Sequence, residues 1–451
     1  MNIAAFIHEL KWEDIPDEAR LQARRCLLDT LGVAVGGRRT ELSRIIHDYA
    51  AAVYGGPGAR LWLDGREVSP PGAALANGMT IDALDIHDGH RLVKGHASVA
   101  LVPATLATLG LDASGVTPIT GREFLTTLVV GWEVALRAGI ALHGTAGDYH
   151  SSGAWSALGC VAVTARRLGL GAEATRHALG IAEYHGPRSQ IMRCVDHPTM
   201  LKDGSGWGAM AGVSAGLLAR AGFTGAPALT VEGADVADVW SDLGRTWRTA
   251  EQDFKPYAVC YWAQPAIAGA LRLQRAHHLP LESIRRIRVS TFREAAHLTS
   301  HEPRTTEEAQ YSLPFPVAAA LVQGRLGADE LTGEALRDPR VLSLSARVEL
   351  VDEPDYDRRF PVERIARVRI DTDGGDTFDS GEAEALWDGP GLPADGELRE
   401  KFRWLTRGHL AASRAAALEE AAWDCADLPD AAALLSLLAP PGAPAAAGAG
   451  L

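Results

Sequence analysis

Carboxylates and imidazoles gather in one short stretch of the chain, DALDIHDGHRLVKGHASVALVPA at residues 82–104. Six of them fall within fifteen residues: Asp82, Asp85, His87, Asp88, His90 and His96. Both side-chain types bind metal ions, but the stretch lacks HExxH or another dependable ligand spacing. A histidine held by an aspartate can instead move protons near neutral pH, because the carboxylate fixes its tautomer and tunes its pKa. A polar loop ahead of an apolar helix is the third interpretation, and the stretch alone leaves all three open.

A second stretch places a histidine just before a helix. In GDYHSSGAWSALG, residues 147–159, His150 precedes Ser151 and Ser152, and serine is a common helix N-cap. A single histidine in such a position more often has a structural role than a catalytic one. This motif by itself therefore leaves the role of His150 undecided.

A third stretch, PTMLKDGSGWGAMAG at residues 198–212, joins a lysine to a glycine-rich turn. It matches neither a P-loop nor a dinucleotide-binding fingerprint, because no strand precedes it and Lys202 comes before the glycines. The free N–H groups of a helix start, together with the ammonium of Lys202, would bind a carboxylate. A surface lysine on a tight turn is the alternative.

A fourth stretch, DFKPYAVCYWAQPA at residues 253–266, carries Lys255 where the composition of the chain changes. Binding sites favour the interfaces between domains, so a lysine at such a junction could close over an anion. An ordinary linker lysine is the competing interpretation.

The elements that must position these residues are mostly helices. Helical spacing of apolar residues starts after Pro16 and recurs up to about residue 221, and Gly208, Gly212 and Gly216 make a smooth stripe for close helix packing. After Pro256 the pattern changes, and residues 286–292, 347–351 and 367–372 alternate as strands do.

The sequence therefore predicts a mainly α protein with a smaller α+β domain placed before the C-terminal helices. We expect helices over residues 1–254, the α+β domain over 255–394, and helices over 395–438 that pack back onto the first part. Residues 439–451 are rich in Ala, Pro and Gly and are expected to be disordered.

Composition narrows the class of protein. The formal charge of −13 argues against nucleic-acid binding, which depends on Lys and Arg at phosphates. The N-terminus shows no signal peptide and no long uninterrupted apolar run occurs, which predicts a cytoplasmic protein that does not cross a membrane. Five scattered cysteines without a CxxC motif indicate free thiols rather than disulfides or a zinc site: Cys26, Cys160, Cys194, Cys260 and Cys425.

Taken in order, the motifs resemble the MmgE/PrpD family, which includes 2-methylcitrate dehydratases, cis-aconitate decarboxylases and iminodisuccinate epimerases. The resemblance runs to about Leu410 and rests on the stretch at residues 82–104 and on five others. These are DEARLQARRCLLDTLGVAVGG, YHSSGAWSALGCVAVTARRLGLGAEATRHALGIA, LKDGSGWGAMAGVSAGLLARAGFTG, KPYAVCYWAQPAIAGAL and PRTTEEAQYSLPFPVAAAL. It implies a helical main domain, an α+β lid, a homodimer, and a cleft between the domains that works without metal or other cofactor.

The resemblance also implies roles for individual residues, and it favours proton chemistry over a metal at residues 82–96. The implied catalytic residues are Asp85, His96, His150 and Lys202. The implied substrate-binding residues are Lys255, Arg188, Arg193, Asp88, His90 and Gly89. Some positions depart from the family: His87 replaces an acid, Gly89 a hydroxyl residue, and Cys260 and Gln264 stand where some members carry histidines.

The expected function is that of a cofactor-independent lyase acting on a citrate-like polycarboxylate such as 2-methylcitrate. Such a reaction breaks a bond next to a carboxylate, so it needs a base, an acid and positive charge. Dehydration is the expected reaction, with epimerisation or decarboxylation within the same family as alternatives. A homologue that binds a metabolite without turning it over is the alternative of another class.

Overall fold

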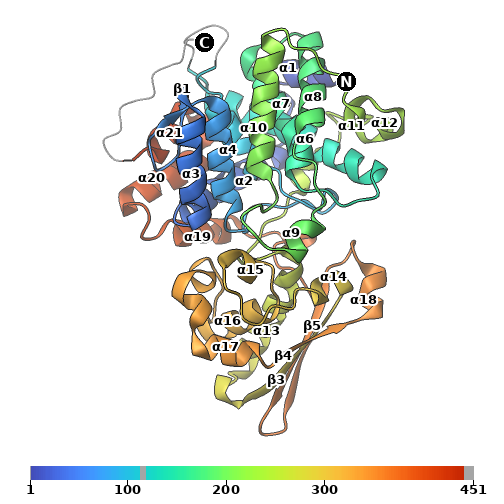
Figure 1. Ribbon diagram of the computed structural model, residues 1–451, viewed down its shortest axis with the longest axis vertical. Coiled ribbons are helices and arrows are strands. Elements are labelled where there is room, and N and C mark those ends of the chain that lie inside the picture. Colours follow the sequence, from blue (N-terminus) through green and yellow to red (C-terminus); the bar gives the residue numbers. More distant parts are fainter. Residues whose placement is uncertain (1, 112–117, 441–451) are drawn as a thin grey trace.

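The computed structural model describes residues 2–111 and 118–440, which form two bodies (Figure 1). The larger body, at the top of Figure 1, is built from helices, and the smaller body below it combines helices with a four-stranded sheet. The predicted fold class, mainly α with a smaller α+β part before the C-terminal helices, is confirmed.

Five helices make the centre of the larger body: α4 (Pro70–Asp82), α5 (Ser98–Ala107), α6 (Gly121–Thr145), α7 (Gly153–Leu168) and α10 (Ser205–Arg220). Helix α7 packs against both α6 and α10, and α10 also packs against α4. The cluster predicted to do chemistry begins at Asp82, the last residue of α4, and continues through the loop between α4 and α5. The loop therefore starts and ends on helices that the core holds in place.

Helices α10 and α7 approach closely because α10 presents glycines to α7. A Cβ atom at Gly208 would lie 2.5 Å from the carbonyl oxygen of Gly153, and one at Gly212 would overlap the carbonyl of Ala157. A Cβ atom at Gly216 would likewise overlap a threonine side chain of α7. The predicted stripe of small residues is thus confirmed as a helix-packing face.

Helix α6 alone, among residues 2–111 and 118–440, is long and apolar enough to cross a membrane by length and composition. In the fold, 94% of its most apolar window is buried. It also carries Glu133 and Arg137, fully buried and 3.5 Å apart. A helix that is apolar on all sides is expected at the centre of a large core, and α6 occupies that place.

The sheet of the smaller body has the strand order β4-β3-β5-β6. Its strands are β3 (Ile284–Thr291), β4 (Val348–Asp352), β5 (Ile365–Thr372) and β6 (Thr377–Glu384). Strands β3 and β4 run parallel, and the other neighbours are antiparallel. Helix α13 (Gln264–His277) packs on β5 and β6, and α16 (Pro314–Gln323) packs on α13. The three segments expected to alternate as strands are β3, β4 and β5, whereas β6 was not predicted.

After the sheet, the chain returns to the larger body through α19 (Asp395–Thr406), α20 (Ala412–Trp423) and α21 (Ala432–Leu438). Helix α19 packs on α2 (Asp17–Gly37), where Lys401 pairs with Asp29 at 2.6 Å. The final segment, expected to be disordered, lies outside the described residues from residue 441 onward.

The two crossings between the bodies lie side by side. The backbone N–H of Phe254 donates to the carbonyl of Trp387 at 3.1 Å, and that of Gly389 donates to Asp253 Oδ1 at 3.1 Å. Asp253 also exchanges two backbone hydrogen bonds with Gly89, at 2.9 and 2.7 Å. The connection between the bodies is therefore tied directly to the loop that carries the acidic and histidine cluster.

Candidate active site

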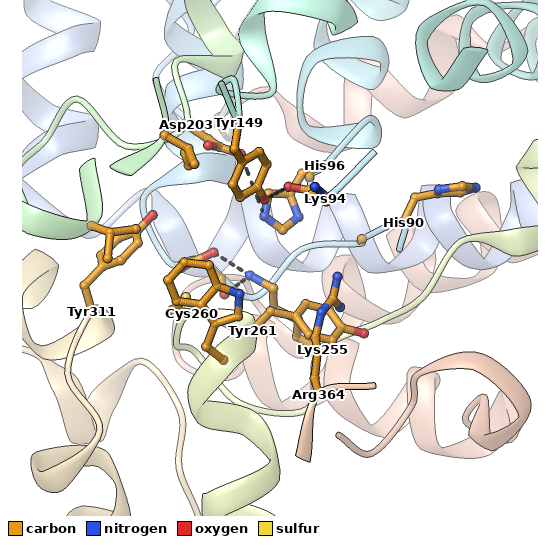
Figure 2. A pocket seen from close by; sticks show the side chains of 16 residues that line it. His90, Lys94, His96, Tyr149, Asp203, Lys255, Cys260, Tyr261, Tyr311 and Arg364 are labelled. Carbon is orange, nitrogen blue, oxygen red and sulfur yellow. Dashed lines mark hydrogen bonds and ion pairs between the residues drawn. The ribbon is translucent and has the colours of Figure 1, made fainter. Parts of the chain in front are cut away.

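A cleft opens between the two bodies beside that loop (Figure 2). It is lined by Asp85, Gly89, His90, Lys94, Gly95, His96, Tyr149, Ile191, Val195, Asp203, Lys255, Cys260, Tyr261, Trp262, Tyr311 and Arg364. The cleft encloses about 530 Å³ counted out to its mouth.

The loop between α4 and α5 is held in an unusual backbone conformation. Asp85 and Lys94 have φ values of +49° and +51°, and Lys202, next to the cleft, has +50°. Residues other than glycine avoid this region, and such strain is typical of functional sites that the surrounding structure holds in place. Here the loop is held by its bonds to Asp253 and by Lys401, which donates to the carbonyl of Ile86 at 2.6 Å.

Asp85 and Lys255 form a buried ion pair that joins the two bodies. Lys255 Nζ lies 2.5 Å from Asp85 Oδ1 and also donates to the Asp85 carbonyl at 3.1 Å. Burial works against ionisation of Asp85, but the charges of Lys255 and Lys202 outweigh it and hold the pKa of this carboxyl well below its usual range. Asp85 is therefore a permanent anion that fixes the ammonium of Lys255, and its Oδ2 has no hydrogen-bond partner among the described residues.

His96 has a ring nitrogen free to accept a proton. Its Nδ1 lies 2.5 Å from the carbonyl oxygen of Asp88, which can only accept, so Nδ1 carries the hydrogen and Nε2 keeps its lone pair. Burial first, and then the charge of Lys255, hold the pKa of His96 well below its ordinary value. The ring is therefore neutral at neutral pH, with Nε2 only 3.8 Å from Asp203 Oδ2.

Asp203 complements His96 as an acid. Burial and the nearby carboxylate of Asp82 raise the pKa of Asp203 to about 7. The hydroxyl of Ser152 donates to Asp203 Oδ2 and accepts from the backbone N–H of His96 at 2.9 Å, so Ser152 ties the two groups together. Asp203 Oδ1 is buried without a hydrogen-bond partner among residues 2–111 and 118–440. A neutral base and a carboxyl that gains and loses its proton near neutral pH thus stand side by side.

Three tyrosines complete the walls: Tyr149, Tyr261 and Tyr311. Burial raises the pKa of each phenol well above its usual range, so all three keep their protons. Tyr149 donates its hydroxyl hydrogen to the carbonyl of Lys94, whereas the Tyr261 hydroxyl has no hydrogen-bond partner in the described part of the chain. Tyr261 therefore offers a donor to whatever enters the cleft.

Of the residues implied from sequence, the structure gathers five on the cleft walls: Asp85, Gly89, His90, His96 and Lys255. His90 lies at one side in Figure 2 and bonds through Nε2 to Glu251 at 3.2 Å. Gly89 touches Tyr261, since a Cβ atom at this position would lie 3.1 Å from the ring.

Two of the implied catalytic residues sit one step behind the walls. Lys202 donates to the side-chain oxygen of Gln310, and its ammonium lies 5.0 Å from the centre of the Tyr311 ring. His150 Nδ1 lies 2.8 Å from the carbonyl of Asp148. Each directly adjoins a lining residue in sequence, Lys202 next to Asp203 and His150 next to Tyr149.

The remaining implied residues lie outside the walls as well. Asp88 is buried beneath the loop, where its Oδ2 accepts from the backbone N–H of Ser98 at 3.1 Å and burial raises its pKa to about 6. Arg188 Nε approaches His150 Nε2 at 3.5 Å, and Arg193 donates to the Ser189 hydroxyl at 3.4 Å. Neither arginine lines the cleft in this structure.

Sequence reasoning missed Asp203 and Arg364. Asp203 stood next to Lys202 in a motif already singled out, and an acid within a run of small residues was a usable signal. Arg364 directly precedes β5, where arginines are also frequent, so its sequence neighbourhood carries no signal. Both residues have buried polar atoms without partners among residues 2–111 and 118–440.

The cluster is not arranged as a metal site in the described residues, where no group of three or more His, Cys, Asp or Glu side chains could hold an ion. Its carboxylates are engaged instead by a lysine at Asp85 and by backbone N–H groups at Asp82 and Asp88. The five cysteines are free, and of these only Cys260 lines the cleft.

Comparison with known families identifies this class of protein. The MmgE/PrpD N-terminal domain matches residues 1–245, and the MmgE/PrpD C-terminal domain matches residues 257–427. The chain belongs to the MmgE/PrpD family, as the motifs predicted. Residues 246–256, which lie between the two matches, include the crossing from the helical body to the smaller body beside the cleft.

The curated relatives are distant but cover nearly the whole chain. The cis-aconitate decarboxylase-like protein oryM of Aspergillus oryzae is 25% identical over 96% of this chain and 95% of its own length. The cis-aconitate decarboxylase of Homo sapiens is 27% identical over 98% of this chain and 95% of its own length. That of Mus musculus is 25% identical over 89% and 85%. These relatives support a lyase of the same family without fixing the reaction of this chain.

Proposed function

We propose that this protein is a lyase that removes water from a citrate-like polycarboxylate, without a cofactor, by proton transfer next to a carboxylate. The observation that carries the proposal is the pairing of His96 and Asp203. A neutral imidazole with a free Nε2 lies 3.8 Å from a carboxyl whose pKa is raised to about 7. The two groups supply the base and the acid that dehydration requires.

The opposite wall supplies positive charge. Lys255 projects from the smaller body into the cleft, and Arg364 lines the same side. A proton next to a carboxylate is weakly acidic because its removal places a second negative charge on the carboxylate. Fixed cations stabilise that charge in a site with little water.

In the proposed reaction, His96 Nε2 takes the proton from the carbon next to the held carboxylate. The carbon–oxygen bond to the hydroxyl then breaks, and Asp203 donates its proton so that water leaves. The product gains a double bond, His96 has gained one proton and Asp203 has lost one. Because the two groups lie 3.8 Å apart, the proton can return from His96 to Asp203 and restore the starting state.

Decarboxylation is the second candidate, and the relatives favour it. Two of the curated relatives named above are cis-aconitate decarboxylases, and the third is named as decarboxylase-like. In this reaction carbon dioxide leaves an unsaturated tricarboxylate, and the carbanion needs only a proton, which Asp203 would donate. The two candidates share the cleft but differ in whether His96 must act as a base.

The proposal gives His150 and Lys202 a role only when the cleft opens. Neither residue lines the cleft in this structure, but each adjoins a lining residue in the sequence. We propose that opening brings His150 forward as a second proton carrier and Lys202 as a charge that holds a carboxylate.

A homodimer is part of the same proposal. Tyr184 on α8 (Ala172–His185) and Leu229 at the start of α11 (Leu229–Glu232) are 82% and 70% exposed, and Glu183 joins these segments by accepting from the N–H of Leu229. Apolar side chains that gather on a surface are typical of contacts with another chain. Light scattering should give twice the chain mass of 47.9 kDa, and an active monomer would contradict it.

The reaction is tested by incubating the protein with citrate, 2-methylcitrate, cis-aconitate and iminodisuccinate in deuterated water and recording NMR spectra. Loss of water with new vinyl signals from citrate or 2-methylcitrate supports dehydration. Loss of carbon dioxide from cis-aconitate supports the second candidate. Deuterium uptake without net reaction would replace both with an epimerase, and binding without any exchange or turnover would leave a metabolite-binding homologue.

A further inference from the structure

Arg364 is a cation of the cleft that its own protein leaves incompletely paired. It precedes β5 on the smaller body, is 7% exposed, and faces the cleft beside Lys255 and Tyr261 (Figure 2). Its guanidinium carbon lies 4.5 Å from the centre of the Tyr261 ring, a stacked position that holds the guanidinium plane in place.

The acidic neighbours of Arg364 are largely committed elsewhere. Asp388 approaches Arg364 only at 3.8 Å but pairs with Arg91 at 2.9 Å. The adjacent Asp253 accepts from the N–H of Gly389, and burial together with Asp388 raises its pKa well above the usual range, which weakens it as a counter-charge for Arg364. Arg364 Nε has no hydrogen-bond partner in the described part of the chain.

Lys255 differs from Arg364 in this respect. It is paired at 2.5 Å with Asp85, which stays ionised, so most of its charge is offset within the protein. A buried cation without a close partner is costly unless a ligand supplies the anion. Of the two cations on this wall, Arg364 therefore has the greater need of an external carboxylate.

We propose that Arg364 binds a carboxylate of the substrate other than the one beside the reacting carbon, and so selects tricarboxylates over dicarboxylates. The proposal rests on the proposed function, because it assigns a substrate class to the same cleft. A guanidinium donates two parallel hydrogen bonds to a carboxylate, which a single ammonium cannot copy. The stacking of Arg364 on Tyr261 orients the guanidinium for such a bond.

The test measures binding of unreactive acids by calorimetry, so that it does not depend on turnover. Tricarballylate carries three carboxylates, and glutarate and methylsuccinate are the same skeleton lacking the central or one terminal carboxylate. The wild-type protein should bind tricarballylate more tightly than at least one of the two dicarboxylates. Arg364→Gln should weaken the binding of tricarballylate about ten- to a hundredfold, the scale of a lost hydrogen bond to a charged group. It should also abolish the preference for tricarballylate over that dicarboxylate.

Two further variants sharpen the result. Arg364→Lys keeps the charge and should recover part of the affinity, though not all, because the paired donors are lost. Arg367→Gln is the matched control, since Arg367 lies on β5 three residues further along the chain, pairs with Asp379 at 2.6 Å and is no part of the cleft. It should bind all three acids as the wild type does.

The outcomes separate this inference from the proposed function. Three results would each overturn the role of Arg364. The variant Arg364→Gln could keep the preference for tricarballylate, it could bind all three acids equally more weakly, or the wild type could show no preference. If the preference depends on Arg364 but no acid is turned over, the role of Arg364 stands and the proposed lyase activity fails. If substrates are turned over and Arg364→Gln keeps its preference, only the role of Arg364 fails.

Discussion

The two walls of the cleft hold their polar groups in different ways. On the helical wall, His96 is neutral and Asp203 titrates near pH 7, and each is fixed by a hydrogen bond within its own body. On the wall of the smaller body, Lys255 and Arg364 are cations, and the partner of Lys255 is Asp85 on the other body. Proton-carrying groups thus lie on one side and charge on the other.

This division has a consequence for how the cleft can move. If the smaller body shifts, His96 and Asp203 keep their separation because Ser152 and the loop hold both. The same shift would change the distance from Lys255 and Arg364 to the reacting carbon. Opening and closing would therefore vary the stabilising charge while the base and the acid stay together.

The largest effect is expected at the helical wall. His96→Gln removes the lone pair that accepts the proton, so kcat should fall about a hundredfold to ten-thousandfold, with a smaller change in KM. His177→Gln is the matched control, because His177 bonds to the carbonyl of Gly225 and is no part of the cleft. Steady-state kinetics with the best substrate provide the measurement.

The same substitution at His150 compares the two histidines. If opening of the cleft brings His150 to the substrate, His150→Gln should also lower kcat, by less than His96→Gln. An effect at His150 that exceeds the effect at His96 would reverse the assignment of the base and break the comparison of the walls.

The next effect concerns the ion pair that joins the walls. Lys255→Met leaves the carboxylate of Asp85 buried without its cation, and loss of one partner of a buried pair costs about 3–5 kcal/mol of unfolding free energy. We expect kcat/KM to fall about a hundredfold as well, since one stabilising charge is lost. Denaturant unfolding and kinetics on the same preparation would measure both.

Arg137→Met is the control for this pair. Arg137 lies 3.5 Å from Glu133, both residues are fully buried, and neither lines the cleft. Its loss should destabilise the fold by a similar amount and lower kcat/KM much less. Equal losses of activity in both variants would show that Lys255 acts only by holding the fold together.

On each wall, sequence alone predicted the residues that a local pattern marks and missed those that only the fold brings in. The loop at residues 82–96 was found because its acids and histidines are neighbours in the chain, and Lys255 because the composition changes there. The raised pKa of Asp203 depends on burial and on Asp82, far away in sequence, so no local pattern reports it. Arg364 meets Tyr261 only through the fold, more than a hundred residues apart in numbering.

The fold shows the same distinction. Strand β3 alternates buried and partly exposed residues, and its alternating apolar side chains predicted it. Strand β6, TFDSGEAE, lies at the edge of the sheet and is mostly exposed, so it lacks the apolar alternation that marks a strand. It forms because β5 offers it a partner, which is a tertiary effect.

A smaller effect, with a distinctive pH dependence, is expected for Asp203→Asn. With a pKa of about 7, Asp203 donates its proton best below that pH, so wild-type kcat should decline as pH rises through 7. The variant should lose this limb and retain about a tenth to a hundredth of kcat. A persistent limb near pH 7 would move the acid to another group.

Stability gives an independent measure of the same group. In the unfolded chain an aspartate ionises near pH 3.8, so between about pH 4 and 7 the folded state holds a proton that the unfolded state has lost. Stability must therefore fall with rising pH across this window. Asparagine does not titrate, so the unfolding free energy of Asp203→Asn should fall less between pH 4 and 7 than that of the wild type.

The smallest effect separates the tyrosines of the two walls. Tyr261 on the smaller body has a buried hydroxyl without a partner in the described part of the chain, whereas Tyr149 on the helical body donates to the carbonyl of Lys94. Tyr261→Phe should leave the unfolding free energy nearly unchanged and raise KM about two- to tenfold, the range of one neutral hydrogen bond to substrate. Tyr149→Phe should instead cost about 1 kcal/mol of stability, because a buried carbonyl loses its donor. If Tyr261→Phe destabilised the protein and left KM unchanged, its hydroxyl would belong to the fold, and the view of the smaller body as the wall that recognises substrate would lose its support.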